Sequence, residues 1–177
     1  MPRTARLLTP VTLAALLLAG CTPSTPMPAP PPTPDATPVF ASDEEALAAA
    51  EEAYGKYLAM VATVLADGGR DPERLKPFLT HDLFLEEVGS YADLRANGWH
   101  GVGSYSFEMS PQRLDLATGD LDVYVCDDRS ALEIVDANGN SVVSPDRPDR
   151  AASQVTFVWQ DKLVIASQIA WEGSGIC

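Results

Sequence analysis

The chain has 177 residues and a formal net charge of −13, with 25 Asp and Glu residues against 12 Lys and Arg residues. Its length allows one domain of ordinary size, and its 46% hydrophobic content is enough for a packed core. The acidic balance argues against nucleic-acid partners and against a basic membrane-surface patch, because both need clustered Lys and Arg to meet phosphates.

Residues 1–20 have the pattern of a secretory signal peptide, with two arginines ahead of an apolar run at Leu7–Ala19. Thirteen residues are too few to cross a bilayer, which needs about 20. The run ends in Leu18-Ala19-Gly20-Cys21, which resembles the lipobox of bacterial lipoproteins and implies a diacylglycerol on Cys21. We therefore expect a lipid anchor at the extracytoplasmic face of the cell membrane. An ordinary signal peptide followed by an incidental cysteine is the alternative.

A proline-rich segment follows, so that residues 21–38 are expected to form a lipidated cysteine and a tether. Eight of the seventeen residues at 22–38 are proline. Such a stretch lacks the donors and the apolar mass to join a core, and it favours polyproline II. It would reach roughly 50 Å at about 3.1 Å per residue. We expect a semi-rigid spacer, and a ligand for proline-binding domains is the alternative.

The folded domain is expected over residues 39–177, beginning with a long amphipathic helix. Ser42 and Glu45 match a capping box at its start, and Gly68-Gly69 marks its end. Apolar residues recur at steps of three and four between these points, at Leu47, Ala50, Tyr54, Tyr57, Leu58, Val61 and Leu65. A short helix is expected from Asp71-Pro72, and one or two further short helices are expected over 80–88 and 90–96.

The hydrophobic period changes from 3.6 to 2 after Gly98, which predicts strands. Asn138-Gly139 is a hairpin signal between the strands at 132–135 and 141–143. The other expected strands lie at 101–116, 121–126, 155–159 and 163–171. Helices followed by a meandering antiparallel sheet predict an α+β fold.

Cys126 and Cys177 remain as an even pair once Cys21 is assigned to lipid. In an oxidising compartment such a pair usually forms a disulfide, and we expect one here, between neighbouring strands. Two free thiols, or a metal site completed by His81 and His100, are the alternatives.

The C-terminal half resembles a group of actinobacterial secreted lipoproteins with an NTF2-like (SnoaL-like) domain. The residues that carry the resemblance are Val123–Asp127, Val135–Gly139, Asp146-Arg147 and Trp171–Cys177. It covers about residues 41–177. The resemblance implies a cone fold, in which N-terminal helices pack in the concavity of a curved antiparallel sheet. It implies a location at the cell envelope but no activity.

A cone of this kind would be lined by aromatic side chains. The candidates for the pocket are Tyr57, Trp99, Tyr105, Phe107, Trp159 and Trp171. Strand alternation places Tyr105 and Phe107 on one face, and it places Trp171 on the same face as Ile165 and Ile169.

Two classes of function follow. We expect a non-catalytic module at the cell envelope, bound to the membrane through its lipid, with a small hydrophobic ligand or an envelope protein as partner. A homodimer through the sheet is a further possibility, and no nucleic acid, metal or cofactor is expected. The alternative is a small isomerase-like or cyclase-like enzyme acting on a hydrophobic molecule. Tyr57 would then stand where isomerases of this superfamily place a helix tyrosine, but no catalytic residue is assigned.

Overall fold

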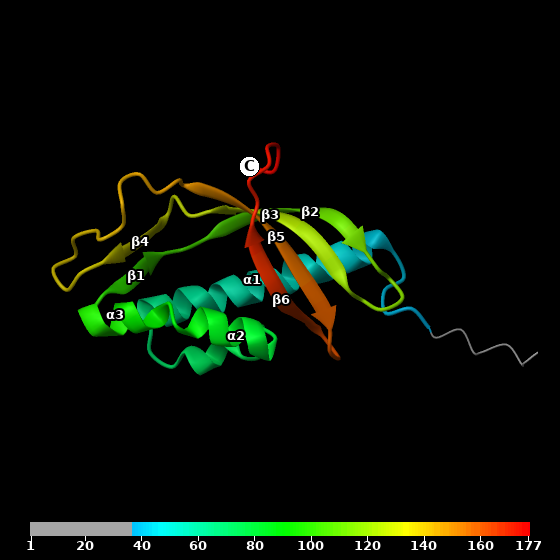
Figure 1. The fold of residues 1–177 in the computed structure, drawn as a ribbon, viewed down its shortest axis with the longest axis horizontal. Coiled ribbons are helices and arrows are strands. Elements are labelled where there is room, and N and C mark those ends of the chain that lie inside the picture. Colours follow the sequence, from blue (N-terminus) through cyan, green and yellow to red (C-terminus); the bar gives the residue numbers. More distant parts are fainter. Residues whose placement is uncertain (1–36) are drawn as a thin grey trace, which may run out of the picture. The chain divides into compact units, whose positions relative to one another are not determined.

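The computed structural model describes residues 37–177, so the expected signal peptide, Cys21 and nearly all of the proline-rich segment lie outside the described residues. The described part folds as an α+β domain, as predicted (Figure 1). Its elements are α1 (Asp43–Ala66), the 3₁₀ turn η1 (Pro72–Leu75), α2 (His81–Val88), α3 (Tyr91–Asn97), β1 (His100–Gly103), β2 (Ser106–Leu114), β3 (Leu121–Asp128), β4 (Leu132–Val135), β5 (Arg150–Trp159) and β6 (Leu163–Ala170). Within these residues no helix is long and apolar enough to cross a membrane.

Helix α1 begins as the capping pattern predicts. The Ser42 side chain accepts a hydrogen bond from the Glu45 amide at 3.2 Å, and the Glu45 carboxylate accepts one from the Ala41 amide at 2.8 Å. Two amides at the helix start are therefore satisfied by side chains. The second expected helix is reduced to the single turn η1, which has its proline at the first position.

Within residues 37–177, six strands form two antiparallel sheets. Four of them lie in the order β2-β3-β5-β6, and β1 pairs with β4 apart from them. Helix α1 runs along the strands, with α2 and α3 on the same side (Figure 1). The core lies between these layers and is filled from α1 and from fully buried residues of the central strands, Leu121, Val123, Val125, Val155 and Phe157.

A bulge in β6 changes which side chains face the helices. Phe157 pairs with Ile165 but Thr156 pairs with Ser167, so β6 has one extra residue at this point. Ile165 is consequently buried, whereas Ile169 is 63% exposed on the opposite face. The expectation that both isoleucines share a face with Trp171 is therefore wrong.

The Asn138-Gly139 turn is present, but its return strand is not extended. Val135 forms a single bridge with Ser141 instead of a ladder over 141–143. The Asp136 carboxylate accepts hydrogen bonds from the amides of Asn138 at 2.8 Å and Asn140 at 2.9 Å, which closes the turn locally.

Cys126 and Cys177 form a disulfide, as predicted, with their Cα atoms 5.3 Å apart. The expectation of neighbouring strands is wrong, because Cys177 lies in the tail beyond β6 and β5 separates β6 from β3. The tail crosses the sheet face that points away from the helices. There the Trp171 amide donates to the Ala152 carbonyl at 2.9 Å, and the Trp171 ring lies 4.8 Å from that of Tyr124.

Candidate functional site

A pocket of about 450 Å³ opens between α1, α2, α3 and β6. Its volume falls within the range of small-molecule sites. The lining combines apolar side chains with carboxylate, hydroxyl and amide groups, namely Tyr57, Val61, Leu65, Leu83, Glu86, Glu87, Ser90, Tyr91, Tyr105 and Gln168. Two of the six aromatic residues predicted for a pocket, Tyr57 and Tyr105, belong to it.

Glu87 is the half-buried carboxylate of this pocket. Its Oε1 accepts a hydrogen bond from the Tyr91 hydroxyl at 2.7 Å, and its Oε2 accepts one from the Tyr57 hydroxyl at 2.9 Å. Burial raises the pKa of Glu87, and the two tyrosine hydrogen bonds offset part of that rise. Burial, with the nearby Glu87 charge, also raises the pKa of both tyrosines, so they remain neutral donors.

A second carboxylate lies deeper, at the end of β3. The fully buried Tyr54 donates its hydroxyl hydrogen to Asp127, with the two carboxylate oxygens at 3.0 and 3.1 Å. Burial raises the pKa of Asp127, and the hydrogen bond from Tyr54 and the charge of Arg129 lower it in part. The Gln168 amide Nε2 donates to the Tyr54 oxygen at 3.1 Å. Gln168 thus connects this buried pair to the pocket.

Local sequence spacing explains how these groups come to face inward. Tyr54 and Tyr57 lie three residues apart on the buried face of α1. Asp127 continues the inward alternation of Val123 and Val125, so a carboxylate takes a position that strand geometry gives to the core. A polar residue in register with an apolar strand face is the signal that identifies Asp127 in the sequence.

Sequence reasoning did not find Glu87, Tyr91 or Gln168. Glu87 and Tyr91 lie four residues apart across the break between α2 and α3, where Ser90 closes the last turn by donating to the Glu87 carbonyl at 2.7 Å. Gln168 faces the pocket only because of the bulge in β6, since it pairs with the buried Val155. A one-residue bulge leaves no clear trace in an alternating pattern.

The other predicted aromatic residues lie in separate places. The Phe107 ring is 5.0 Å from that of Tyr54 and lines a recess of about 190 Å³ beside α1. Trp99 lines a cavity of about 420 Å³ near Arg70 and Arg95.

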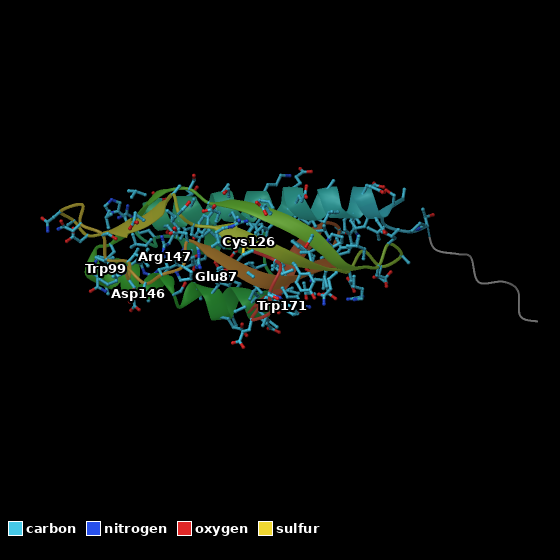
Figure 2. The ribbon with its side chains drawn as sticks, turned by 90° about the horizontal axis from the view of Figure 1, so that it is seen from above. Glu87, Trp99, Cys126, Asp146, Arg147 and Trp171 are labelled. Atoms are coloured by element: carbon cyan, nitrogen blue, oxygen red, sulfur yellow. A yellow bond between two sulfur atoms is a disulfide. The ribbon has the colours of Figure 1, made fainter. Side chains whose placement is uncertain are left out.

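Trp159 and Trp171 lie elsewhere again. The Trp159 ring makes an edge contact with Phe40, with ring centroids 5.5 Å apart, and is 38% exposed at a groove of about 340 Å³. Trp171 lies with the tail, and Figure 2 shows it well apart from Trp99 along the domain. The six residues therefore do not form one site. Within residues 37–177, no group of three His, Cys, Asp or Glu side chains is placed to hold a metal ion.

Comparisons with known proteins bear on the fold alone. No family model and no curated protein matches the sequence. The intermembrane space region of the chloroplast protein ARC6 is similar in structure, with a TM-score of 0.51 and 13% identity over 70% of this chain and 95% of that one. A de novo beta sheet design protein also matches, with a TM-score of 0.37 and 17% identity over 70% of this chain and 88% of that one. The ARC6 likeness agrees with a mixed helix and sheet arrangement.

Proposed function

We propose that this chain is a lipid-anchored, extracytoplasmic module that binds a small molecule in the pocket beside Glu87, without catalysis. The observation that carries the proposal is the pocket itself, where half-buried and exposed polar groups surround a floor of Val61 and Leu65. The lipobox-like Leu18–Cys21 supports the anchor. The disulfide between Cys126 and Cys177 is in keeping with an oxidising compartment.

The NTF2-like cone belongs to the same proposal. Its support is the arrangement of α1, α2 and α3 on one face of an antiparallel sheet, with the central strands supplying the buried surface. An envelope protein as partner and a homodimer through the sheet are further expectations, which rest on the sequence alone.

Binding is favoured over catalysis because the acid groups are already engaged. Both oxygens of Glu87 accept hydrogen bonds from tyrosines. Asp127 is only 8% exposed and does not line the pocket, and Tyr54 is fully buried. A general base must reach the proton that it removes, which the buried Asp127 cannot do, and the two tyrosine hydrogen bonds make Glu87 a weaker base.

A small cone enzyme is the second candidate, and one observation favours it. Glu87 and Asp127 are two carboxylates with raised pKa values, each hydrogen-bonded to tyrosine, as proton-transfer sites often are. Turnover of a hydrophobic substrate that Tyr57→Phe abolishes, while the fold stays intact, would place this candidate first.

Native mass spectrometry of the full chain purified from its membranes tests the binding proposal. We expect a small molecule to be retained by the wild-type protein and lost from Ser90→Trp, because the indole would fill the pocket from its exposed rim. Ala92→Trp, an exposed position on α3 outside the pocket lining, is the matched control and should retain the molecule. Equal retention by both variants would contradict the proposal.

A further inference from the structure

The hydroxyl groups in and beside the pocket already donate their hydrogens to protein acceptors. Tyr57 and Tyr91 donate to Glu87, and Tyr54 donates to Asp127. The Ser90 hydroxyl donates to the Glu87 carbonyl. Four hydroxyl hydrogens are thus already used. The three of these hydroxyls that line the pocket, those of Tyr57, Ser90 and Tyr91, leave oxygen lone pairs toward a ligand.

Gln168 adds a further acceptor to the pocket. Its Nε2 donates one hydrogen to the Tyr54 oxygen, which orients the side chain and leaves the carbonyl oxygen and the second amide hydrogen free. Tyr105 is the remaining lining hydroxyl, and within residues 37–177 its side chain makes no hydrogen bond. A ligand that meets mostly acceptors must bring donors of its own, because a buried acceptor without a partner costs free energy.

The charges around the pocket also favour a ligand that brings hydrogen-bond donors, namely a cation. Glu86 and Glu87 line the pocket, and no Lys, Arg or His of the described chain does. Two cations, Arg129 and Arg147, lie near Tyr105 but do not line the pocket. The Arg147 guanidinium donates to the carbonyls of Arg129 at 3.2 Å and Leu132 at 2.8 Å. The whole chain carries a net charge of −13, which attracts cations and repels anions.

The apolar side of the pocket indicates the chemistry of the remainder of the ligand. Val61, Leu65 and Leu83 supply aliphatic surface. The half-buried ring of Tyr105 adds an aromatic face, which also favours a cation nearby. A small polar ion would leave this surface uncovered, whereas a ligand with an apolar body would cover it.

We infer that the pocket takes an amphiphilic organic cation, whose primary ammonium group lies between the Glu87 carboxylate and the Gln168 carbonyl and whose apolar body lies on Val61, Leu65 and Leu83. The inference rests on the proposed binding function and adds the chemical class of the ligand. The ammonium supplies three donors to a site that offers acceptors, and its charge neutralises Glu87.

Three probes of nearly equal shape test the inference by isothermal titration of the full chain in one detergent. They are 2-phenylethylammonium, 2-phenylethanol and phenylacetate. We expect the ammonium to bind wild-type protein at least about tenfold more tightly than the alcohol, and phenylacetate to bind most weakly. Glu87→Gln should abolish the preference for the ammonium and leave the affinity for the alcohol within about twofold. Glu51→Gln, on the exposed face of α1 outside the pocket, is the control and should change nothing.

The results separate this inference from the binding proposal. Equal binding of the ammonium and the alcohol, a cation preference that survives Glu87→Gln, or no binding of the ammonium would each overturn the inference. If the alcohol or phenylacetate binds and Ser90→Trp abolishes that binding, the binding proposal is supported. In that case only the assigned ligand class is wrong.

A measurement on wild-type protein keeps the test valid if Glu87→Gln fails to fold. The groups that face Glu87 are Tyr57 from α1, Glu86 from α2, Tyr91 from α3 and Tyr105 from the segment between β1 and β2. Burial raises the pKa of Glu87, so acidification from pH 8 to about pH 4 neutralises this carboxylate, whereas the three tyrosines stay neutral throughout. The affinity for the ammonium should fall on acidification while that for the alcohol stays constant, and an ammonium affinity independent of pH would overturn the inference.

Discussion

Glu87 stays an acceptor in a half-buried setting because two tyrosine hydroxyls donate to it, one to each oxygen. Tyr91 and Tyr57 thereby orient the carboxylate, and they lower its pKa against the larger, opposite effect of burial. Each hydrogen bond to a charged group of this kind contributes about 1.5–3 kcal/mol to stability.

Tyr91→Phe should raise the pKa of Glu87 further and lower the free energy of unfolding by about 1–2 kcal/mol, because one donor to the carboxylate is lost. Carbon-detected NMR titration of the Glu87 carboxyl group measures the first effect, and urea denaturation measures the second. Tyr124→Phe is the control, since that ring packs against Trp171 on the other face of the sheet. An unchanged Glu87 titration in Tyr91→Phe would show that the hydrogen bond does not form in solution.

The raised pKa of Glu87 also predicts how stability depends on pH. A carboxyl whose pKa is higher in the folded state binds its proton more tightly there, so its contribution is fully present below the unfolded value near 4.5 and is lost as pH rises through the folded value. The unfolding free energy of the wild type relative to Glu87→Gln should therefore decrease as pH rises above 4.5. Urea denaturation of both proteins across this window measures the difference, and a constant difference would contradict the raised pKa.

The C-terminal tail is the element whose position depends most on a covalent bond. It follows β6 and crosses the outer face of β5 to reach Cys126 on β3, and the disulfide closes a loop with a sequence separation of 51 residues. On the chain-entropy estimate, closing such a loop raises the free energy of the unfolded chain by about 4 kcal/mol.

Cys177→Ser should lower the free energy of unfolding by about 3–4 kcal/mol, and reduction of the wild type should have a similar effect. Urea denaturation with and without reductant measures both. The double variant Cys126→Ser with Cys177→Ser is the control, because it must be insensitive to reductant. A wild-type protein whose stability does not respond to reduction would contradict a stabilising role for this bond.

At this scale the sequence predicts some elements well and others poorly, for identifiable reasons. Helix α1 follows from Ser42, Glu45 and a regular apolar face, which are local signals. The bulge in β6 depends on how Thr156 and Phe157 pair with a distant strand, and no local signal marks it. The faces of Ile165 and Ile169 are opposite for that reason.

At the scale of the whole molecule, the α+β class follows from the change of period after Gly98, but the site does not follow in the same way. The polar groups of the site come from α1, from α2, from the ends of β3 and β6, and from α3. Tertiary packing brings these groups together. Two of the hydrogen bonds between them join residues that are 73 and 114 positions apart in the sequence, respectively. The sequence offered aromatic residues as candidates, and packing distributed them among several places.

Attachment to the membrane is a property of the whole chain, and it tests the proposed location. Cys21→Ser should move the protein from the membrane fraction to the soluble fraction, because the acyl chains that the lipobox-like segment implies would be absent. Mass spectrometry of the N-terminal peptide should find a diacylglyceryl group on Cys21 in the wild type only. Unchanged fractionation of Cys21→Ser would exclude the lipid anchor.

The central claim is that the pocket between α1, α2, α3 and β6 is a binding site, and methyl NMR tests it most directly. During titration of the full chain with 2-phenylethylammonium, the methyl resonances of Val61, Leu65 and Leu83 should shift together and saturate. Val142, which is 37% exposed and lies outside the pocket, should not shift. Methyl resonances of Val61, Leu65 and Leu83 that stay fixed while others move, or that drift without saturating, would contradict the claim.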